Sequence, residues 1–261
     1  MTLGLLAVLP VLSLAGAVVS GLLGVGGAIV MIPLLLYGPP LLGVGDLDMR
    51  AVSAITMVQV FVAAVSGMLA HRRHRGVNAR LALVGGVAMS AGSLTGALVS
   101  RFVPDEALLV VFAAMVTVAA GFMFVRTPQT DVLTPGQERP FSRTLTALVA
   151  LVVGVGAGIV GAGGAFLLVP LLLVVVGMPI RVTIGSSLAI TALAALAGVV
   201  GKFVTGQVPL MPALVVALGA LPGASLGAAL SRRLSGATLK LSLGVIIVIT
   251  GLRVWWDVLW R

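Results

Sequence analysis

Uncharged apolar segments of about 20 residues recur along the whole 261-residue chain. This is the length that an α-helix needs to cross the roughly 30 Å hydrocarbon core of a bilayer. The composition agrees, because 60% of the residues are hydrophobic and 9% are charged, a balance that would leave a soluble domain with a very large exposed apolar surface. The alternation typical of membrane β-barrels is absent. The sequence therefore predicts an all-α polytopic membrane protein.

Residue types that build metal centres and catalytic sites are scarce. Cysteine is absent, and the two histidines lie in the arginine-rich stretch "HRRHR" (71–75), so we expect no metal site and no cofactor. An intramembrane protease would need a Ser–His pair or two aspartates within the spans, and an enzyme is therefore not expected. The net charge of +9 indicates an excess of Lys and Arg on the cytoplasmic side rather than a nucleic-acid partner.

The chain repeats itself on either side of a polar segment. "GLLGVGGAIVMIPLLL" (21–36) and "GIVGAGGAFLLVPLLL" (158–173) share nine of sixteen residues at an offset of 137, and "GSLTGALVSR" (92–101) corresponds to "GASLGAALSR" (223–232) at an offset of 131. Internal duplication is common in transporter folds. The predicted organisation is a first transmembrane repeat at 1–125, a linker loop at 126–143 and a second transmembrane repeat at 144–261.

Each half is expected to contain one glycine-interrupted segment and three ordinary spans, which gives 8–10 helical segments. The ordinary spans are predicted at 50–70, 78–100, 105–125, 181–203, 208–231 and 238–258. If the interrupted segment crosses the bilayer once, the repeats are parallel; if it doubles back, they are inverted, which the distribution of Lys and Arg slightly favours. The four arginines of the loop 71–80 predict that this loop, and with it the linker 126–143, is cytoplasmic.

The glycine clusters predict a break in the helix in each half. Small residues also allow close helix packing, and this interpretation suits the GxxxG pairs Gly92/Gly96 and Gly223/Gly227. The clusters, however, are denser than packing requires, and each glycine costs about 1 kcal/mol relative to alanine in a helix interior. A break survives in a bilayer only where protein or a water-filled cavity surrounds it. The half-helices that begin after the breaks would offer free amides and a positive dipole end to an anion. The predicted binding residues at the breaks are Gly24, Gly26, Gly27, Ala28, Gly161, Gly163, Gly164 and Ala165.

Polar side chains in the span after each break form a one-sided stripe. Ser53, Thr56 and Gln59 recur every three residues, whereas Thr183, Ser187 and Thr191 recur every four. From these stripes we predict that Thr56, Gln59, Ser187 and the adjacent Ser186 bind substrate, although such residues also commonly bond to their own helix backbone.

Charged residues near the span ends have two interpretations. Arg50 and Arg181 are predicted to attract anions into a vestibule, with interfacial anchoring as the alternative. Lys202 is expected to be a span-end charge that reaches the headgroups. All seven acidic residues fall at predicted span ends or in loops, so no buried carboxylate is expected to serve a proton relay or a sodium site.

The doubled pattern GxxGxGGxxxxxPLLL resembles that of the sulfite exporter TauE/SafE family of bacterial membrane transporters. The resemblance extends over nearly the whole chain, with Ala28 and Ala165 standing where the family often has a further glycine. It implies movement of sulfite, sulfonates and related organosulfur anions, mostly export, across the bacterial cytoplasmic (inner) membrane.

The predicted function is therefore a secondary transporter, in the direction of export, of a small oxyanion such as sulfite or a short organosulfonate. Two alternatives stay open: a passive anion channel, and a membrane scaffold that transports nothing. The expected partners are the anion and the lipid bilayer. The sequence leaves the exact substrate, the direction, the coupling ion and the oligomeric state open, including a homo-oligomer.

Overall fold

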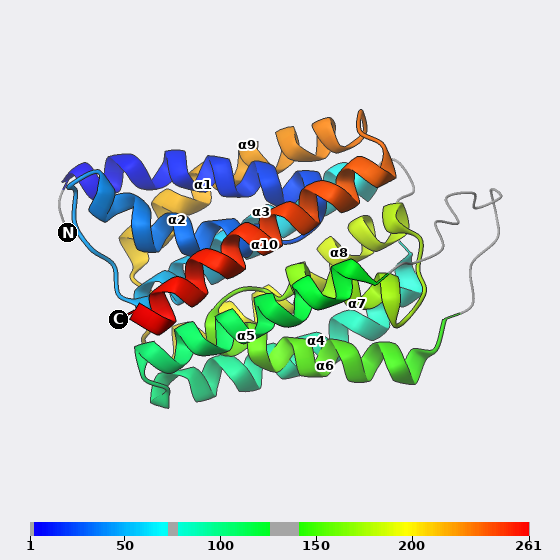
Figure 1. Ribbon diagram of the computed structural model, residues 1–261. Helices are drawn as coiled ribbons and strands as arrows, with labels where there is room; N and C mark the ends of the chain where they lie inside the picture. Colours follow the sequence, from blue (N-terminus) through cyan, green and yellow to red (C-terminus); the bar gives the residue numbers. More distant parts are fainter. Residues whose placement is uncertain (1–2, 73–77, 126–140, 261) are drawn as a thin grey trace.

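The computed structural model describes residues 3–72, 78–125 and 141–260, and these residues form an all-helical bundle without β-strands (Figure 1). A short 3-10 turn, η1 (Ser100–Phe102), follows the fourth helix. The α-helices are α1 (Leu3–Leu23), α2 (Ala28–Leu41), α3 (Met49–Arg72), α4 (Ala79–Val99), α5 (Asp105–Phe124), α6 (Arg143–Val160), α7 (Ala165–Val174), α8 (Ile180–Val204), α9 (Leu210–Ser231) and α10 (Gly236–Trp260).

Eight of the described helices are long and apolar enough to cross a bilayer, and α2 and α7 are shorter apolar helices. The six ordinary spans predicted from hydropathy coincide with α3, α4, α5, α8, α9 and α10, with ends that differ by at most two residues. Large apolar side chains such as Leu83, Val152 and Leu218 are exposed on the outside of the bundle, where lipid would cover them. The chain is thus a multi-pass membrane protein, as predicted. Most of the predicted linker, at 126–140, and part of the arginine-rich loop, at 73–77, lie outside the described residues.

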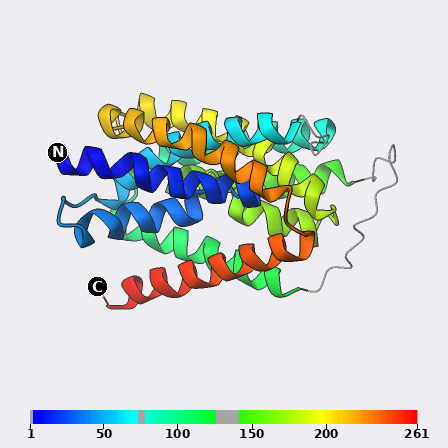
Figure 2. The same ribbon diagram turned by 90° about the horizontal axis from the view of Figure 1, so that it is seen from above.

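The two glycine-interrupted segments double back. In Figure 1, α1 begins at the left end of the bundle and α2 returns to that end, whereas α6 begins at the right end and α7 returns there. Likewise α3 runs from left to right and α8 from right to left. Both ends of the chain lie at the same end of the bundle (Figure 2). These directions agree with the inverted arrangement, while the internal duplication itself remains a prediction from sequence.

Glycines bring two pairs of helices into backbone contact. A Cβ placed on Gly227 of α9 would lie 2.0 Å from the carbonyl oxygen of Val18 in α1, and a Cβ on Gly96 of α4 would lie 2.1 Å from that of Val155 in α6. Gly92 and Gly223, the other members of the GxxxG pairs, approach the same partner helices. The packing role predicted for these four glycines is therefore confirmed, and each pair joins a helix of the first half to one of the second.

We predict that Gly227→Ala lowers the free energy of unfolding by about 1–3 kcal/mol, because the added methyl group forces α1 and α9 apart. Gly121→Ala is the matched control, since Gly121 also lies inside a helix but has no atom within 4 Å of a Cβ position. The control should gain stability, up to about 1 kcal/mol, from its better helix propensity. Thermal unfolding in detergent measures both variants, and a melting temperature of Gly227→Ala at or above that of the unsubstituted protein would contradict the packing argument.

Candidate functional site

Both predicted helix breaks are present, and they have the same backbone conformation. Helix α1 ends at Leu23 and α2 begins at Ala28; α6 ends at Val160 and α7 begins at Ala165. Three glycines in each gap have a positive φ: +71°, +73° and +77° for Gly24, Gly26 and Gly27, and +76°, +60° and +70° for Gly161, Gly163 and Gly164. Residues with a Cβ rarely adopt these angles, so the glycines are what allows the chain to turn.

Each break creates the N-terminus of a helix inside the protein. Gly27 and Gly164 are the N-cap residues of α2 and α7, and neither helix has a side-chain cap. The carbonyl of each N-cap glycine accepts from the amides three and four residues later, at 3.1 and 2.9 Å. The first two amides of each helix, those of residues 28 and 29 and of residues 165 and 166, come before the first bonded amide. They therefore point out of the helix end, where the macrodipole is positive.

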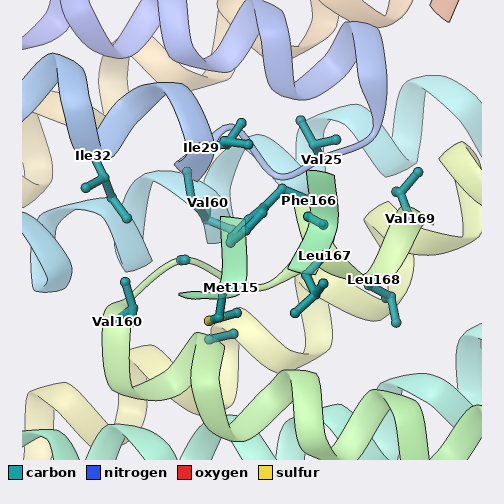
Figure 3. Close-up of a cluster of buried hydrophobic side chains, with 14 of the residues drawn as sticks. Val25, Ile29, Ile32, Val60, Met115, Val160, Phe166, Leu167, Leu168 and Val169 are labelled. Atoms are coloured by element: carbon teal, nitrogen blue, oxygen red, sulfur yellow. The ribbon is translucent and has the colours of Figure 1, made fainter. Parts of the chain in front are cut away.

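The two breaks meet in the interior of the bundle. A Cβ on Gly26 would lie 3.4 Å from that of Ala165, and a Cβ on either Gly26 or Gly163 would contact Val60 of α3 and Thr191 of α8. Every residue from 23 to 29 and from 161 to 170 is buried. Apolar side chains from both segments and from α3 belong to one buried cluster around them (Figure 3). The breaks are therefore occluded in this conformation.

Each break is held by a helix of the other half. The hydroxyl of Ser187 in α8 donates to the carbonyl oxygen of Gly24 at 2.8 Å. On the other side, a Cβ on Gly161 would lie 1.9 Å from the carbonyl oxygen of Ser53 in α3, so only glycine allows this approach. The predicted stripes on α3 and α8 thus lie against the breaks, and the predicted Ser187 contacts one of them directly.

Several fully buried polar side chains near the breaks have no hydrogen-bond partner among the described residues. They are Ser20, Thr56, Gln59, Ser93 and Thr191. Gln59 leaves both amide atoms unpaired, and its Nε2 would lie 3.2 Å from a Cβ on Gly27. Buried polar groups without a partner are rare in proteins and call for a specific explanation, such as a bound ion or water. Here they supply donors of the kind that an oxyanion accepts from.

Three predicted residues belong to other parts of the bundle than the breaks. The hydroxyl of Ser186 accepts from the backbone N–H of Asn78 at 2.9 Å, so it ties α8 to the start of α4. Arg181 is the second residue of α8, and its side chain lies outside the described part of the structure. Arg50 is the second residue of α3, at the opposite end of the bundle, where its Nε lies 3.7 Å from a carboxylate oxygen of Asp105.

Arg50 lines a pocket of about 490 Å³ at the end of the bundle where α3 begins and α8 ends. The pocket also contains Arg101, Gln207 and Asp48, and the Asp48 carboxylate accepts from the backbone N–H of Ala51 at the start of α3. The vestibule role of Arg50 stays a prediction. No group of three or more metal-ligating side chains is found within the residues that the structure describes.

The prediction for Lys202 was wrong. Instead of reaching the headgroups, its side chain is fully buried. Its Nζ donates to Ser100 Oγ at 3.1 Å, to Gln207 Oε1 at 3.4 Å and to the carbonyl oxygen of Ile159 at 3.5 Å. The lysine is enclosed because η1 and the turn after α8 fold over it, a tertiary arrangement that hydropathy does not reveal.

Sequence reasoning also missed several polar residues that pack at the breaks or beside the pocket. Thr191 belongs to the predicted stripe on α8 but was not assigned to the site, although a Cβ on either Gly26 or Gly163 would meet it. Ser20 precedes the first cluster by one residue, and a polar residue there was a usable signal. For Ser100 and Gln207, which lie at span ends, the sequence carried no signal.

Comparisons with known proteins agree with a transporter. Residues 8–254 match the family described as Sulfite exporter TauE/SafE. The chain is 25% identical to the probable membrane transporter protein YunE of Bacillus subtilis (strain 168), over 94% of this chain and 95% of that protein. It is 28% identical to a probable membrane transporter protein of Xylella fastidiosa (strain Temecula1), over 90% and 89%. A match at 22% identity, over 95% of each chain, is the probable membrane transporter protein MJ0441 of Methanocaldococcus jannaschii.

No solved structure was found to match the chain. The family match covers all ten described α-helices in whole or in part, including both glycine breaks. The chain therefore belongs to the sulfite exporter TauE/SafE family and is a membrane transporter.

Proposed function

We propose that this transporter carries a small oxyanion such as sulfite or a short organosulfonate, in the direction of export, and binds it at the paired helix breaks. The description of the family supports the substrate class. The breaks would supply backbone amides at two positive helix ends, and Gln59, Thr56 and Thr191 would supply hydrogen bonds. A sulfur oxyanion has three or more acceptor oxygens that such donors can satisfy together.

The observation that carries this proposal is the combination of the breaks with unpaired polar side chains in a fully buried position. A scaffold has no use for two interior helix ends, each of which frees backbone groups that cost several kcal/mol if left unpaired in hydrocarbon. An open anion channel would need a continuous path, whereas residues 23–29 and 161–170 are buried throughout. The occlusion favours alternating access over a passive channel.

The arginine-rich loop supplies the proposed orientation. With the loop 71–80 and the linker 126–143 on the cytoplasmic side of the bacterial inner membrane, the pocket of Arg50 and Arg101 faces the outside. In an exporter this pocket would be the exit. Its positive charge would hold a departing anion weakly, because the side chain of Arg50 remains 41% exposed and already lies beside Asp105.

Flux through the purified protein in liposomes tests the proposed function. Loading with sulfite, sulfoacetate, thiosulfate or sulfate in turn should give transport of at least one anion above that of empty liposomes. Steady single-channel conductance would favour the channel instead. Absence of both flux and conductance with all four anions would remove the proposal.

We predict that Gly163→Ala reduces anion flux about tenfold or more, because the added Cβ would lie 2.3 Å from Val60 Cγ1 and strains a left-handed backbone. Gly43→Ala is the control: Gly43 has a φ of +66° but no atom within 4 Å of a Cβ position. Both variants carry the backbone strain, so normal flux in the control assigns the loss to the break. Equal flux in the two variants would contradict a role for the second break.

Gln59→Met should separate stability from transport. Removing two buried amide atoms that have no partner is expected to raise the free energy of unfolding by about 1–3 kcal/mol, while anion flux falls because a donor is lost. Thr250→Val is the comparison, because the buried Thr250 hydroxyl does have a partner, the carbonyl of Ile29 at 3.2 Å. That variant should lose about 1 kcal/mol. Thermal unfolding in detergent and liposome flux provide the two measurements, and Gln59→Met with undiminished flux would exclude Gln59 from the site.

A further inference from the structure

Lys202 is a fully buried lysine that has no acidic partner among the described residues. Its Nζ contacts a hydroxyl, an amide oxygen and a backbone carbonyl, all of them neutral groups. Of the five described acidic residues, Asp105 lies beside Arg50, Asp257 pairs with Arg253 and Asp48 caps α3. The other two, Asp46 and Glu106, are exposed. A buried charge is costly unless an opposite charge pairs with it. An anion would bring the negative charge that no described side chain supplies to Lys202.

The surroundings of Lys202 connect it to the pocket. Gln207 lines the pocket and accepts from the lysine Nζ at 3.4 Å. Ser100 Oγ lies 3.1 Å from the same atom and precedes Arg101, another residue of the pocket wall. The lysine thus lies directly behind the pocket, and the two arginines make the wall in front of it positive.

Lys202 also contacts the last turn of α6, just before the second helix break. Its Nζ reaches the carbonyl oxygen of Ile159 at 3.5 Å, and Ser53 Oγ donates to the same oxygen at 3.5 Å. Ile159 lies two residues before Gly161, and Gly161 packs directly on Ser53. Lys202 therefore contacts both a residue of the pocket wall and the end of the helix that precedes the break.

We propose that Lys202, with Ser100 and Gln207, binds a small oxyanion as it moves between the pocket and the break at Gly161–Gly164. This inference rests on the proposed function and adds a charged, gate-like site to it. The ammonium would exchange its neutral partners for the anion, while the Ser100 hydroxyl and the Gln207 amide, after a change of rotamer, donate to other oxygens of the same ligand. The flexible stem of lysine allows the ammonium to follow the anion from one side to the other.

A structural role is the competing explanation. A cation near the end of α6 is favoured by the helix dipole, and the Ile159 carbonyl belongs to the last turn of α6. That role concerns folding alone, so it predicts that removing the charge changes stability and leaves anion affinity unaltered. The two explanations therefore differ in a measurable way.

Lys202→Met tests the proposal, with Lys240→Met as the matched control because Lys202 and Lys240 are the two lysines of the chain. In liposomes, Lys202→Met should raise the half-saturating sulfite concentration about tenfold or more, as expected for loss of a hydrogen bond to a charged group. Lys202→Arg should recover part of the affinity. The half-saturating sulfite concentration of Lys240→Met should stay within about twofold of that of the unsubstituted protein, since this substitution removes no charge from the proposed anion path.

Melting in detergent with and without sulfite provides a readout that does not depend on transport. Sulfite should raise the melting temperature of the unsubstituted protein and of Lys240→Met, and this shift should disappear in Lys202→Met. If the unsubstituted protein shows no flux but the lysine-dependent shift is present, the transport proposal fails and the anion site stands. Unchanged half-saturation and an unchanged shift in Lys202→Met overturn the site and leave the transport proposal intact.

Gln207→Leu covers the case in which Lys202→Met does not fold. Gln207 is partly exposed at the pocket, so its loss is expected to be tolerated, and the half-saturating sulfite concentration should rise by about threefold to tenfold. Wild-type affinity in Gln207→Leu, together with an unfolded Lys202→Met, would assign Lys202 to structure and overturn the proposal.

Discussion

Backbone amides and carbonyls that leave a helix inside a bilayer have no water to bond to, and this constraint determines most of what surrounds the two glycine segments. The segments are not exposed to lipid; they meet each other, and α3 and α8 cover them. The carbonyl of Gly24 is satisfied by Ser187. The close approach of Ser53 to Gly161 leaves no room for a side chain. A break of this kind is stable only with the whole bundle assembled around it.

The helix pairing follows from the same requirement. Each broken segment is shielded from lipid by helices of the other half as well as its own. Accordingly, α1 packs against α9 and α6 against α4, through glycines that bring the backbones into contact. The halves interlock as a result, and α3 of the first half packs against α8 of the second. On the proposed function, a change of access has to move these glycine contacts together, because neither half has a separate core.

The spans and the breaks were predictable because both depend on local sequence. A continuous apolar run of sufficient length forms a helix in a bilayer, because its backbone groups then bond to one another. The glycines around Gly26 and Gly163 lower the free-energy cost of a non-helical backbone conformation at these two places. Lys202 and Ser186 were not predictable in this way. A lysine near the end of a span reaches the headgroups or turns inward depending on what folds over it, here η1 and the turn at Gln207. Likewise, Ser186 and Ser187 are neighbours in sequence, but helical geometry sends one to α4 and the other to the first break.

The two breaks share a backbone conformation but differ in the polar groups around them. The first has the unpaired amide of Gln59 near Gly27, a position that corresponds to the apolar Ile190 at the offset of 131 residues. The second has the Lys202 ammonium near the end of α6, where the corresponding residue of the first half is His71. On the proposed function, a neutral amide and an ammonium would hold an anion with different strength, since hydrogen bonds that involve a charged group are the stronger. On the same proposal, an oxyanion passing between the breaks would therefore meet two chemically different sites, a neutral amide beside the first and an ammonium near the second.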